Sequence, residues 1–381
     1  MKIALVVPGG VDRSGEYRVI PALLALIARL STDDEVHVFA LLQEAQPETW
    51  ELLGARVHNI GAGHTKLRAI RAICAEHRRS AFHLIHAIWS GVPGFVAVAA
   101  ARVLGLPSLI HLGGGELVAL RDIGYGGRLK WQGRAREAVV LRAATVVTAA
   151  SVPMIEMLAR LGISARRLPL GADLDIWTPR APTRRDLSTP TRLIQVASLN
   201  RVKDQPTLLR ALAMLAESKA DFVMDLIGED ILQGEIHALA DRLGLSQRVR
   251  FRGFLPQREL LPIMERAHLM IISSRHEAGP LAVLEAGIKG VPCVGTAVGH
   301  VAEWAPEAAV AVPVGDADAL ARATIELMRN EERRLHIARA AERRATQENA
   351  DYTARSFRAI YATVTASRQV RMKRTDADAR Q

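Results

Sequence analysis

The sequence predicts an α/β protein made of two doubly wound domains, each a parallel sheet with helices on both faces. A chain of 381 residues exceeds the usual size of one domain. Short apolar runs rich in β-branched residues alternate with longer amphipathic runs, which is the pattern of a parallel sheet covered on both faces. A proline-rich polar segment interrupts this alternation once, so we expect one linker between two domains.

The first domain is expected at residues 1–172. Its predicted strands are 2–8, 35–41, 56–60, 83–88, 107–112 and 144–149, with amphipathic helices at 17–30 and 67–77. The N-terminal "MKIALVVPGG" is too short and glycine-broken for a signal peptide and is interpreted as the first strand. The longest apolar run, 91–112, contains an arginine and two prolines, which favours a buried helix and strand over a membrane span.

A linker is predicted at 173–191, followed by the second domain at 192–351. The predicted strands there are 192–199, 222–228, 249–254, 268–274, 291–295 and 308–313. The predicted helices are 205–217, 233–243, 257–267, 280–289, 300–304, 316–330 and 331–347. A final helix at 352–366 carries three aromatic residues and is expected to pack back on the first domain, ahead of a polar tail at 367–381.

Composition limits the chemistry. Only Cys74 and Cys293 occur, far apart, so neither a disulfide framework nor a cysteine metal site is expected, and a reducing cytoplasm is predicted. Histidines and cysteines show no ligand spacing, and no D-x-D lies at a strand end beside the candidate site residues. The "DAD" at 316–318 is interpreted as a helix N-cap. We therefore expect no metal requirement.

The formal net charge is +10 and is spread over both halves of the chain. Two basic clusters occur, at 66–79 and 128–142. They are compatible with solvated helix faces, with an anionic acceptor, or with peripheral contact to an anionic membrane surface. Aromatic residues make up only 4% and do not alternate with the basic ones, so we expect no nucleic-acid partner.

The segment "HEAGPLAVLEAGIKG" (276–290) holds the most informative pattern. Glu277 lies in a loop after a predicted strand, where open α/β sheets bind ligands. We predict Gly279 as N-cap and Pro280 as the first helical residue, which places Glu285 in the second turn. The free N–H groups at this helix start, including that of Leu281, suit a phosphate.

Two carboxylates on either side of a phosphate-binding turn predict a nucleotide-sugar site. One carboxylate would bind sugar hydroxyls, and the other would bind the ribose diol. The alternative is that Glu277 is a surface residue and Glu285 pairs with an arginine. The apolar residues around Glu285 make an idle buried charge costly, which disfavours that alternative.

Together, "EAGPLAVLEA" and "GVPCVGTAVGHVAE" resemble the E-x7-E signature of retaining GT-B glycosyltransferases of family 4, the glycosyl transferases group 1. The resemblance covers nearly the whole chain. "LPLGADLDIWTP" is similar to the family's inter-domain segment, "VASLNRVKDQPTLLRAL" to its phosphate-binding strand-loop-helix, and "VRFRGF" to its V-x-F-x-G stretch. It implies a GT-B fold, with an acceptor-side first domain and a donor-binding second domain facing each other across a cleft.

The resemblance also implies a role for each site residue. Glu277 and His111 would be catalytic, at the sugar's reacting face and near its anomeric carbon, and His86 is a weaker candidate. For the donor, Gly15 would lie beside the diphosphate, and Arg201 and Lys203 would supply its positive charges. Phe254 and Leu255 would contact the base, and Glu285 would bind the ribose. The phosphate turn would consist of Gly279, Pro280 and Leu281. One departure is Ser198, which stands where the family has arginine.

The implied activity is retaining transfer of a hexosyl unit from a nucleoside-diphosphate sugar to a glycan, lipid-linked or small-molecule acceptor in polysaccharide or glycoconjugate biosynthesis. The expected location is the cytoplasm, and this expectation includes peripheral contact with the inner face of the membrane. Two alternatives stay open. One is a nucleotide-sugar epimerase of GT-B fold. The other is a binding or scaffold protein that has lost catalysis, for which Ser198 is the main argument.

Overall fold

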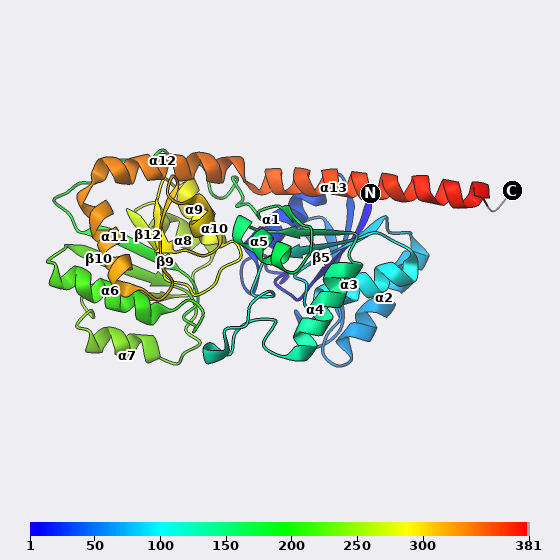
Figure 1. Cartoon of the computed structure of the whole chain (residues 1–381), viewed down its shortest axis with the longest axis horizontal. Coiled ribbons are helices and arrows are strands. Elements are labelled where there is room, and N and C mark those ends of the chain that lie inside the picture. The colour runs from blue at the N-terminus through cyan, green and yellow to red at the C-terminus, as the bar shows by residue number, and fades with distance from the viewer. Residues whose placement is uncertain (379–381) are drawn as a thin grey trace. The chain divides into compact units, whose positions relative to one another are not determined.

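The chain folds into two compact units, each built around its own sheet, in the computed structural model (Figure 1). The structure describes the backbone of residues 1–378 and the side chains of residues 1–368. The first unit contains residues 1–150 and 154–170 together with the chain from residue 350 onward, and the second contains 151–153 and 171–349. Both units are parallel α/β structures, which confirms the predicted fold class.

The first unit is built on an eight-stranded sheet in the order β3-β4-β2-β1-β5-β6-β7-β8. Its strands are β1 (Lys2–Val7), β2 (Glu35–Ala40), β3 (Glu48–Leu52), β4 (Ala55–Asn59), β5 (Leu84–Ile88), β6 (Ser108–Leu112), β7 (Val146–Ala149) and β8 (Arg166–Arg167). Only β3 runs antiparallel to its neighbour. The sequence analysis missed β3, because four of its five residues are not buried and leave no apolar run.

The helices of this unit are α1 (Pro21–Leu30), α2 (Thr65–Arg79), α3 (Val92–Leu104), α4 (Trp131–Ala143), α5 (Val152–Arg160) and α13 (Ala350–Asp378), and the short η1 (Arg121–Ile123) has no buried residue. The apolar run 91–112 is thus a helix and a strand, as predicted. Within residues 1–378 no helix is long and apolar enough to cross a membrane.

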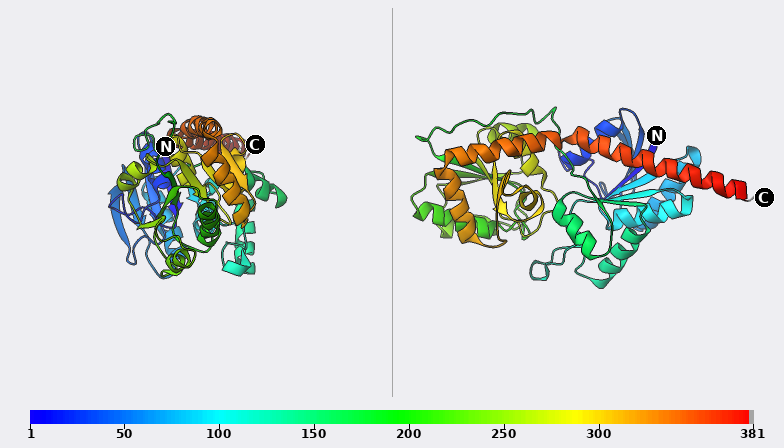
Figure 2. Two further views of the ribbon diagram at one scale, coloured as in Figure 1. Left: turned by 90° about the vertical axis from the view of Figure 1, so that its left-hand side faces the viewer. Right: turned by 45° about the horizontal axis from the view of Figure 1, so that its top comes forward.

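Helix α13 packs against α1 of the first unit, although α1 ends at Leu30 and α13 begins only at Ala350 (Figure 2, red). Phe357 and Tyr361 lie one turn apart and are fully buried in the apolar core of this unit. The helix extends past the predicted end at 366, so residues 367–378 are helical and not an irregular tail. The remaining predicted tail, 379–381, lies outside the described residues.

The second unit has a six-stranded sheet in the order β11-β10-β9-β12-β13-β14, with every pair parallel. Its strands are β9 (Thr191–Val196), β10 (Phe222–Ile227), β11 (Val249–Gly253), β12 (Leu269–Ile272), β13 (Cys293–Thr296) and β14 (Ala309–Val312). Its helices are α6 (Gln205–Glu217), α7 (Glu235–Arg242), α8 (Gln257–Met264), α9 (Leu281–Ile288), α10 (Gly299–Trp304), α11 (Ala317–Arg329) and α12 (Glu331–Gln347).

Two apolar clusters lie on opposite faces of this second sheet. Neighbouring strand residues alternate between them: Leu269 and Ile271 belong to one cluster, and Met270 and Ile272 to the other. This alternation explains why strands covered on both faces are continuously apolar in the sequence. The chain order reverses between β9 and β12, where doubly wound sheets bind ligands beyond the carboxyl ends of their strands.

Residues 173–190 of the predicted linker form no helix or strand, its last residue, Thr191, begins β9, and the linker is attached firmly to the second unit. Trp177 is fully buried, and the backbone N–H of Arg180 donates to the carbonyl of Ile288 at 2.9 Å. The Arg185 guanidinium binds the Glu331 carboxylate at 2.8 Å. Burial alone would raise the pKa of Glu331, but hydrogen bonds from arginine side chains hold this pKa at about 2.

We predict that Phe357→Ala destabilises the first unit by about 3–5 kcal/mol, the usual cost of removing a buried aromatic ring. Phe357 is fully buried, and its ring centroid lies 4.6 Å from that of His86. Urea unfolding followed by circular dichroism measures the loss. The exposed neighbour Arg355→Ala serves as control and should change stability by less than about 0.5 kcal/mol. Equal unfolding midpoints for both variants would contradict the packing role of α13.

Candidate functional site

The carboxyl ends of β9 and β12 bring two loops of the second unit together. Ser273 Oγ donates a hydrogen bond to the Lys203 carbonyl at 2.8 Å, and the N–H of Arg275 donates to the Val202 carbonyl at 2.8 Å. The Asn200 side-chain oxygen accepts from the Lys203 N–H at 3.1 Å. These bonds fix the position of the Lys203 backbone beside the loop that carries Glu277.

Lys203 and Glu277 form the central ion pair of this site. Lys203 Nζ lies 2.6 Å from Glu277 Oε1, and Ser274 Oγ donates to the same oxygen at 2.6 Å. The side chains are 24% and 11% exposed, so both groups remain reachable from solvent. The sequence analysis named Lys203 and Glu277 separately and did not predict that they pair, and it missed Ser274, whose position directly before the Glu277 loop was the available signal.

Helix α9 begins one residue later than predicted. Pro280 is the N-cap, with extended backbone angles, and Leu281 is the first helical residue. The prediction that Gly279 is the N-cap is therefore wrong, because Pro280 adopts a ψ of 114°, outside the helical range. Among the described residues the N–H groups of Leu281 and Ala282 have no hydrogen-bond acceptor, so this helix start retains free donors.

Gly299 allows a third loop to approach the same place. A Cβ atom there would lie 3.1 Å from Glu277 Cβ and 3.0 Å from Pro280 Cδ, and its φ is +49°. Both the close contact and the positive φ favour glycine at this position. The sequence analysis did not single out Gly299, although its place in "TAVGH" after a strand is a signal for such a turn.

Glu285 is almost completely buried. It is 4% exposed, and Gln257 Nε2 donates to its Oε1 at 3.2 Å. Burial raises the pKa of Glu285 to about 7, and the Gln257 hydrogen bond offsets this only in part. The carboxyl group therefore gains a proton near neutral pH. The sequence analysis missed Gln257, which lies far from Glu285 in the chain.

The predicted base-binding residues lie before α8. Phe254 has a 52% exposed side chain. Leu255 is partly buried and packs against the same apolar cluster as Leu281. Gln257, three residues after Phe254, contacts Glu285. This part of the chain thus connects the predicted base and ribose positions through adjacent residues.

Arg201, predicted to bind the diphosphate, pairs with a glutamate of its own unit. Its guanidinium makes two hydrogen bonds to the Glu235 carboxylate, at 2.9 and 2.7 Å, and its side chain is 54% exposed. A phosphate would have to compete with Glu235 for this group. Ser198, which replaces the family arginine, accepts a hydrogen bond at its carbonyl from Gln205 Nε2 at 3.2 Å.

His111 lies near the end of β6 in the first unit and is fully buried. Burial lowers its pKa to about 3, so the ring is neutral. Its Nδ1 lies 3.0 Å from Thr148 Oγ1, and its buried Nε2 has no hydrogen-bond partner among the described residues. His86 is also fully buried, and its Nδ1 lies 2.7 Å from the Tyr361 hydroxyl, which favours a structural role for His86.

Two further features of the first unit lie in strand-end loops. Gly15 adopts a φ of +69°, which explains the glycine in this loop. Glu116 follows β6 and is buried; it accepts hydrogen bonds from the N–H groups of Gly114 at 2.8 Å and Ser90 at 3.3 Å. Because His111 and Gly15 belong to one unit and Lys203 and Glu277 to the other, the predicted joint site stays a prediction.

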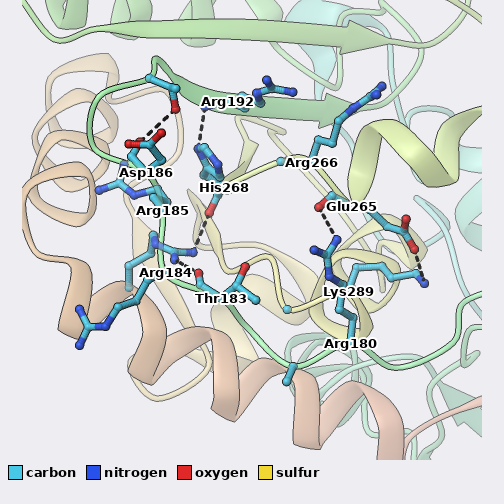
Figure 3. A pocket seen from close by; sticks show the side chains of 15 residues that line it. Arg180, Thr183, Arg184, Arg185, Asp186, Arg192, Glu265, Arg266, His268 and Lys289 are labelled. Atoms are coloured by element: carbon cyan, nitrogen blue, oxygen red, sulfur yellow. Dashed lines mark hydrogen bonds and ion pairs between the residues drawn. The ribbon is translucent and has the colours of Figure 1, made fainter.

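A strongly basic cavity of about 310 Å³ lies elsewhere in the second unit (Figure 3). Arg192, near the start of β9, and His268, just before β12, border this cavity. The cavity therefore lies at the amino ends of these strands, whereas Lys203 and Glu277 follow their carboxyl ends. Several of its cations are already engaged: Lys289 Nζ lies 2.9 Å from Glu265 Oε1, and Arg334 binds Glu331 at 2.6 Å. This cavity is not the predicted donor site.

Comparisons with known proteins match both units. A model of the "Glycosyl transferase 4-like domain" matches residues 19–171, and one of "Glycosyl transferases group 1" matches residues 182–344. A D-inositol 3-phosphate glycosyltransferase of Corynebacterium urealyticum is 30% identical over 208 residues, which cover 50% of this chain and 49% of that protein. The lipopolysaccharide core biosynthesis glycosyltransferase LpsE of Rhizobium meliloti is 30% identical over 164 residues, covering 42% and 46%. The chain thus spans about half the length of these curated relatives.

Solved structures share the fold. The sucrose-phosphate synthase of Thermosynechococcus elongatus superposes with a TM-score of 0.82 at 20% identity, covering 96% of this chain and 100% of that one. HepE of Anabaena, in complex with UDP-glucose, superposes with a TM-score of 0.73 at 19% identity, covering 95% and 100%. At these identities the likeness concerns the fold.

We predict that Glu285→Gln makes stability less dependent on pH. In the wild type the unfolded carboxyl ionises above about pH 4.5, while the buried one keeps its proton to about pH 7. Wild-type stability therefore falls between these values and then levels off. The variant should gain up to about 3 kcal/mol relative to wild type between pH 5 and 8. Urea unfolding at pH 5 and pH 8 measures this difference in stability between variant and wild type. The variant Glu307→Gln, which changes an exposed carboxyl, is the control. A constant difference between variant and wild type would contradict the raised pKa.

Proposed function

This chain belongs to the glycosyl transferases group 1 family and is a glycosyltransferase of GT-B fold, and from that premise we propose its reaction and site. The proposed reaction moves a hexosyl unit from a nucleoside-diphosphate sugar to a glycan, lipid-linked or small-molecule acceptor, with retention at the anomeric carbon. It serves polysaccharide or glycoconjugate biosynthesis. HepE, which shares the fold, is described in complexes with UDP and UDP-glucose, and this supports a nucleotide-sugar donor.

The observation that carries the proposal is the Lys203–Glu277 ion pair beside the free N–H groups of α9. The leaving nucleoside diphosphate gains negative charge in the transition state, and preorganised donors stabilise that charge. Lys203 Nζ and the Leu281 and Ala282 N–H groups are such donors. Glu277 binds donor-sugar hydroxyls and stabilises positive charge at the anomeric carbon.

The acceptor proton goes to the leaving phosphate oxygen as the sugar departs, so Glu277 forms no covalent bond in this mechanism. Glu285 binds the ribose hydroxyls, with Gln257 orienting its carboxyl. His111, neutral because it is buried, serves as a hydrogen-bonding group for the sugar through its unpartnered Nε2. Charge stabilisation by Lys203 and N–H groups makes a metal unnecessary for transfer.

The surface of helix α4 supports the proposal that the acceptor is presented on an anionic membrane surface. Trp131 at its start is 67% exposed and Val139 is 59% exposed, and the helix lies within the basic cluster 128–142. Exposed aromatic and apolar side chains next to arginines are typical of peripheral membrane contact. We keep this partner, and a cytoplasmic location at the inner membrane face, as part of the proposal.

Two other functions are separable from this one. An epimerase of GT-B fold would convert the nucleotide sugar without an acceptor. A scaffold protein would bind a nucleotide sugar without turning it over, and the pairing of Arg201 with Glu235 adds to the argument from Ser198. The intact Lys203–Glu277 pair favours turnover over a scaffold role.

We predict that Glu277→Gln lowers kcat about 100-fold while the dissociation constant of the nucleoside diphosphate changes little, because the carboxylate acts on the sugar rather than on the nucleotide. Product formation from a panel of nucleotide sugars and acceptors measures kcat, and calorimetry measures binding. Glu307→Gln, which changes an exposed carboxyl, is the control. Full transfer by Glu277→Gln would place the active site elsewhere. Interconversion of nucleotide sugars by the wild type, without acceptor, would indicate the epimerase.

We predict that Glu285→Ala, in contrast to Glu277→Gln, mainly weakens nucleotide binding. Losing the ribose contact should weaken UDP or GDP binding about tenfold or more, in line with about 1.5–3 kcal/mol for a hydrogen bond to a charged group. Thermal shift with UDP and GDP measures it, because a ligand that binds the folded state raises the melting temperature. An unchanged nucleotide shift in a folded Glu285→Ala variant would remove Glu285 from the site.

A further inference from the structure

Two histidines and a glutamate meet in the first unit, on elements that the proposed reaction does not use. His37 lies on β2, His58 on β4 and Glu76 on α2. One ligand atom from each lies within 4.8 Å of the other two. His37 and Glu76 are buried, and His58 is partly buried. The residues are widely spaced in the chain, so no ligand motif is visible in the sequence.

The distances between these atoms are close to those of a metal site. His37 Nδ1 lies 2.9 Å from His58 Nε2 and 3.9 Å from Glu76 Oε1. Bonds of about 2.0–2.1 Å in a tetrahedral zinc site place neighbouring ligand atoms about 3.3 Å apart. The two observed distances lie on either side of that value. The first distance would have to lengthen and the second to shorten by about half an ångström to match this value, and all three ligand atoms lie within 4.8 Å of one another.

A fourth side chain orients the first histidine. His37 Nε2 lies 3.0 Å from Glu35 Oε1, so Nε2 carries the proton and donates it to this carboxylate. The Nδ1 lone pair then faces His58 and Glu76. Metal-bound histidines have this arrangement, in which the second ring nitrogen donates to a carboxylate that fixes the tautomer.

Aromatic rings hold both imidazoles in place. The His58 ring stacks on Phe39, with centroids 4.7 Å apart and an interplanar angle of 10°. The His37 ring meets Phe82 edge to face, at 5.4 Å and 81°. Little side-chain freedom remains to be lost on binding an ion, which favours binding.

Lys2 supplies positive charge here. Its Nζ lies 3.0 Å from Glu35 Oε1, 3.4 Å from Glu76 Oε1 and 5.1 Å from the centroid of Phe82. Two carboxylates face this ammonium group, and Arg79 Nη1 lies 3.4 Å from Glu76 Oε2, so two cations balance the two carboxylates when the imidazoles are neutral. A cation would compete with Lys2 for Glu76, while Lys2 keeps its contacts with Glu35 and Phe82.

We propose that His37, His58 and Glu76 bind Zn²⁺ or a similar first-row divalent ion, with Glu35 as the positioning residue and water as a fourth ligand. Imidazole nitrogen with one carboxylate suits Zn²⁺, whereas Mg²⁺ and Ca²⁺ prefer all-oxygen sites. The ion joins β2, β4 and α2 and has a structural role. The expectation that transfer needs no metal is separate from this site.

The test uses the full-length chain without a histidine tag, stripped with a chelator. Titration with Co²⁺, followed by visible absorption and then displaced by Zn²⁺, should show one bound ion with nitrogen and oxygen ligands and a raised melting temperature. His58→Ala should abolish binding. The exposed His336→Ala in the second unit should bind like wild type. Glu35→Gln, which keeps the length of the side chain but replaces its carboxylate with a neutral carboxamide, should bind about 10- to 100-fold more weakly, as expected for loss of an orienting carboxylate.

Lys2→Met provides an independent measurement, because removing the competing ammonium should tighten Zn²⁺ binding several-fold. A purely structural hydrogen-bond network predicts no such gain. The proposal is overturned if the wild-type chain binds no Co²⁺ or Zn²⁺ at micromolar concentration, or if His58→Ala and His336→Ala bind equally. Unchanged affinity in a folded Glu35→Gln variant would overturn the assigned role of Glu35.

Discussion

Parallel pairing of every strand in the second sheet is the constraint on which the candidate donor site depends. Because all six strands run the same way, the loops after β9 and β12 leave the same edge of the sheet. Hydrogen bonds such as that from Ser273 Oγ to the Lys203 carbonyl then join these loops. Lys203 and Glu277, 74 residues apart, meet as a consequence. The pair needs no dedicated scaffold beyond the sheet itself.

Burial of ionisable groups is the second theme of the structure. His111 and Glu285 both lie where water does not reach, and burial moves each pKa toward the neutral form: downward for the histidine and upward for the carboxyl. Glu331 is the counterexample, since two arginines keep it charged and attach the linker to the second unit. Burial without a charged partner thus favours the neutral form of these groups, whereas paired arginines keep the Glu331 carboxylate charged.

Sequence periodicity predicted the elements well where burial is uniform. Helices α6 and α12 occupy the predicted ranges 205–217 and 331–347. The errors occur where local pattern carries little information: β3 is mostly not buried, α9 starts after Pro280, and α13 continues through polar residues. In the site, Glu277 and Glu285 were recognisable from spacing and family resemblance. Ser274 was missed although it directly precedes the Glu277 loop, and Gln257 was missed because it lies 28 residues from Glu285 in the chain.

By itself, the sequence determined that the chain is a two-domain α/β protein and that it resembles the family to which it belongs, since apolar periodicity and the E-x7-E spacing are local properties of the chain. Only the tertiary structure decided which charges meet. It paired Lys203 with Glu277 and Arg201 with Glu235, and it gathered His37, His58 and Glu76 in the first unit. The physical reason is that side-chain partners across a sheet depend on strand order and register, which bring together residues that no short stretch of sequence contains.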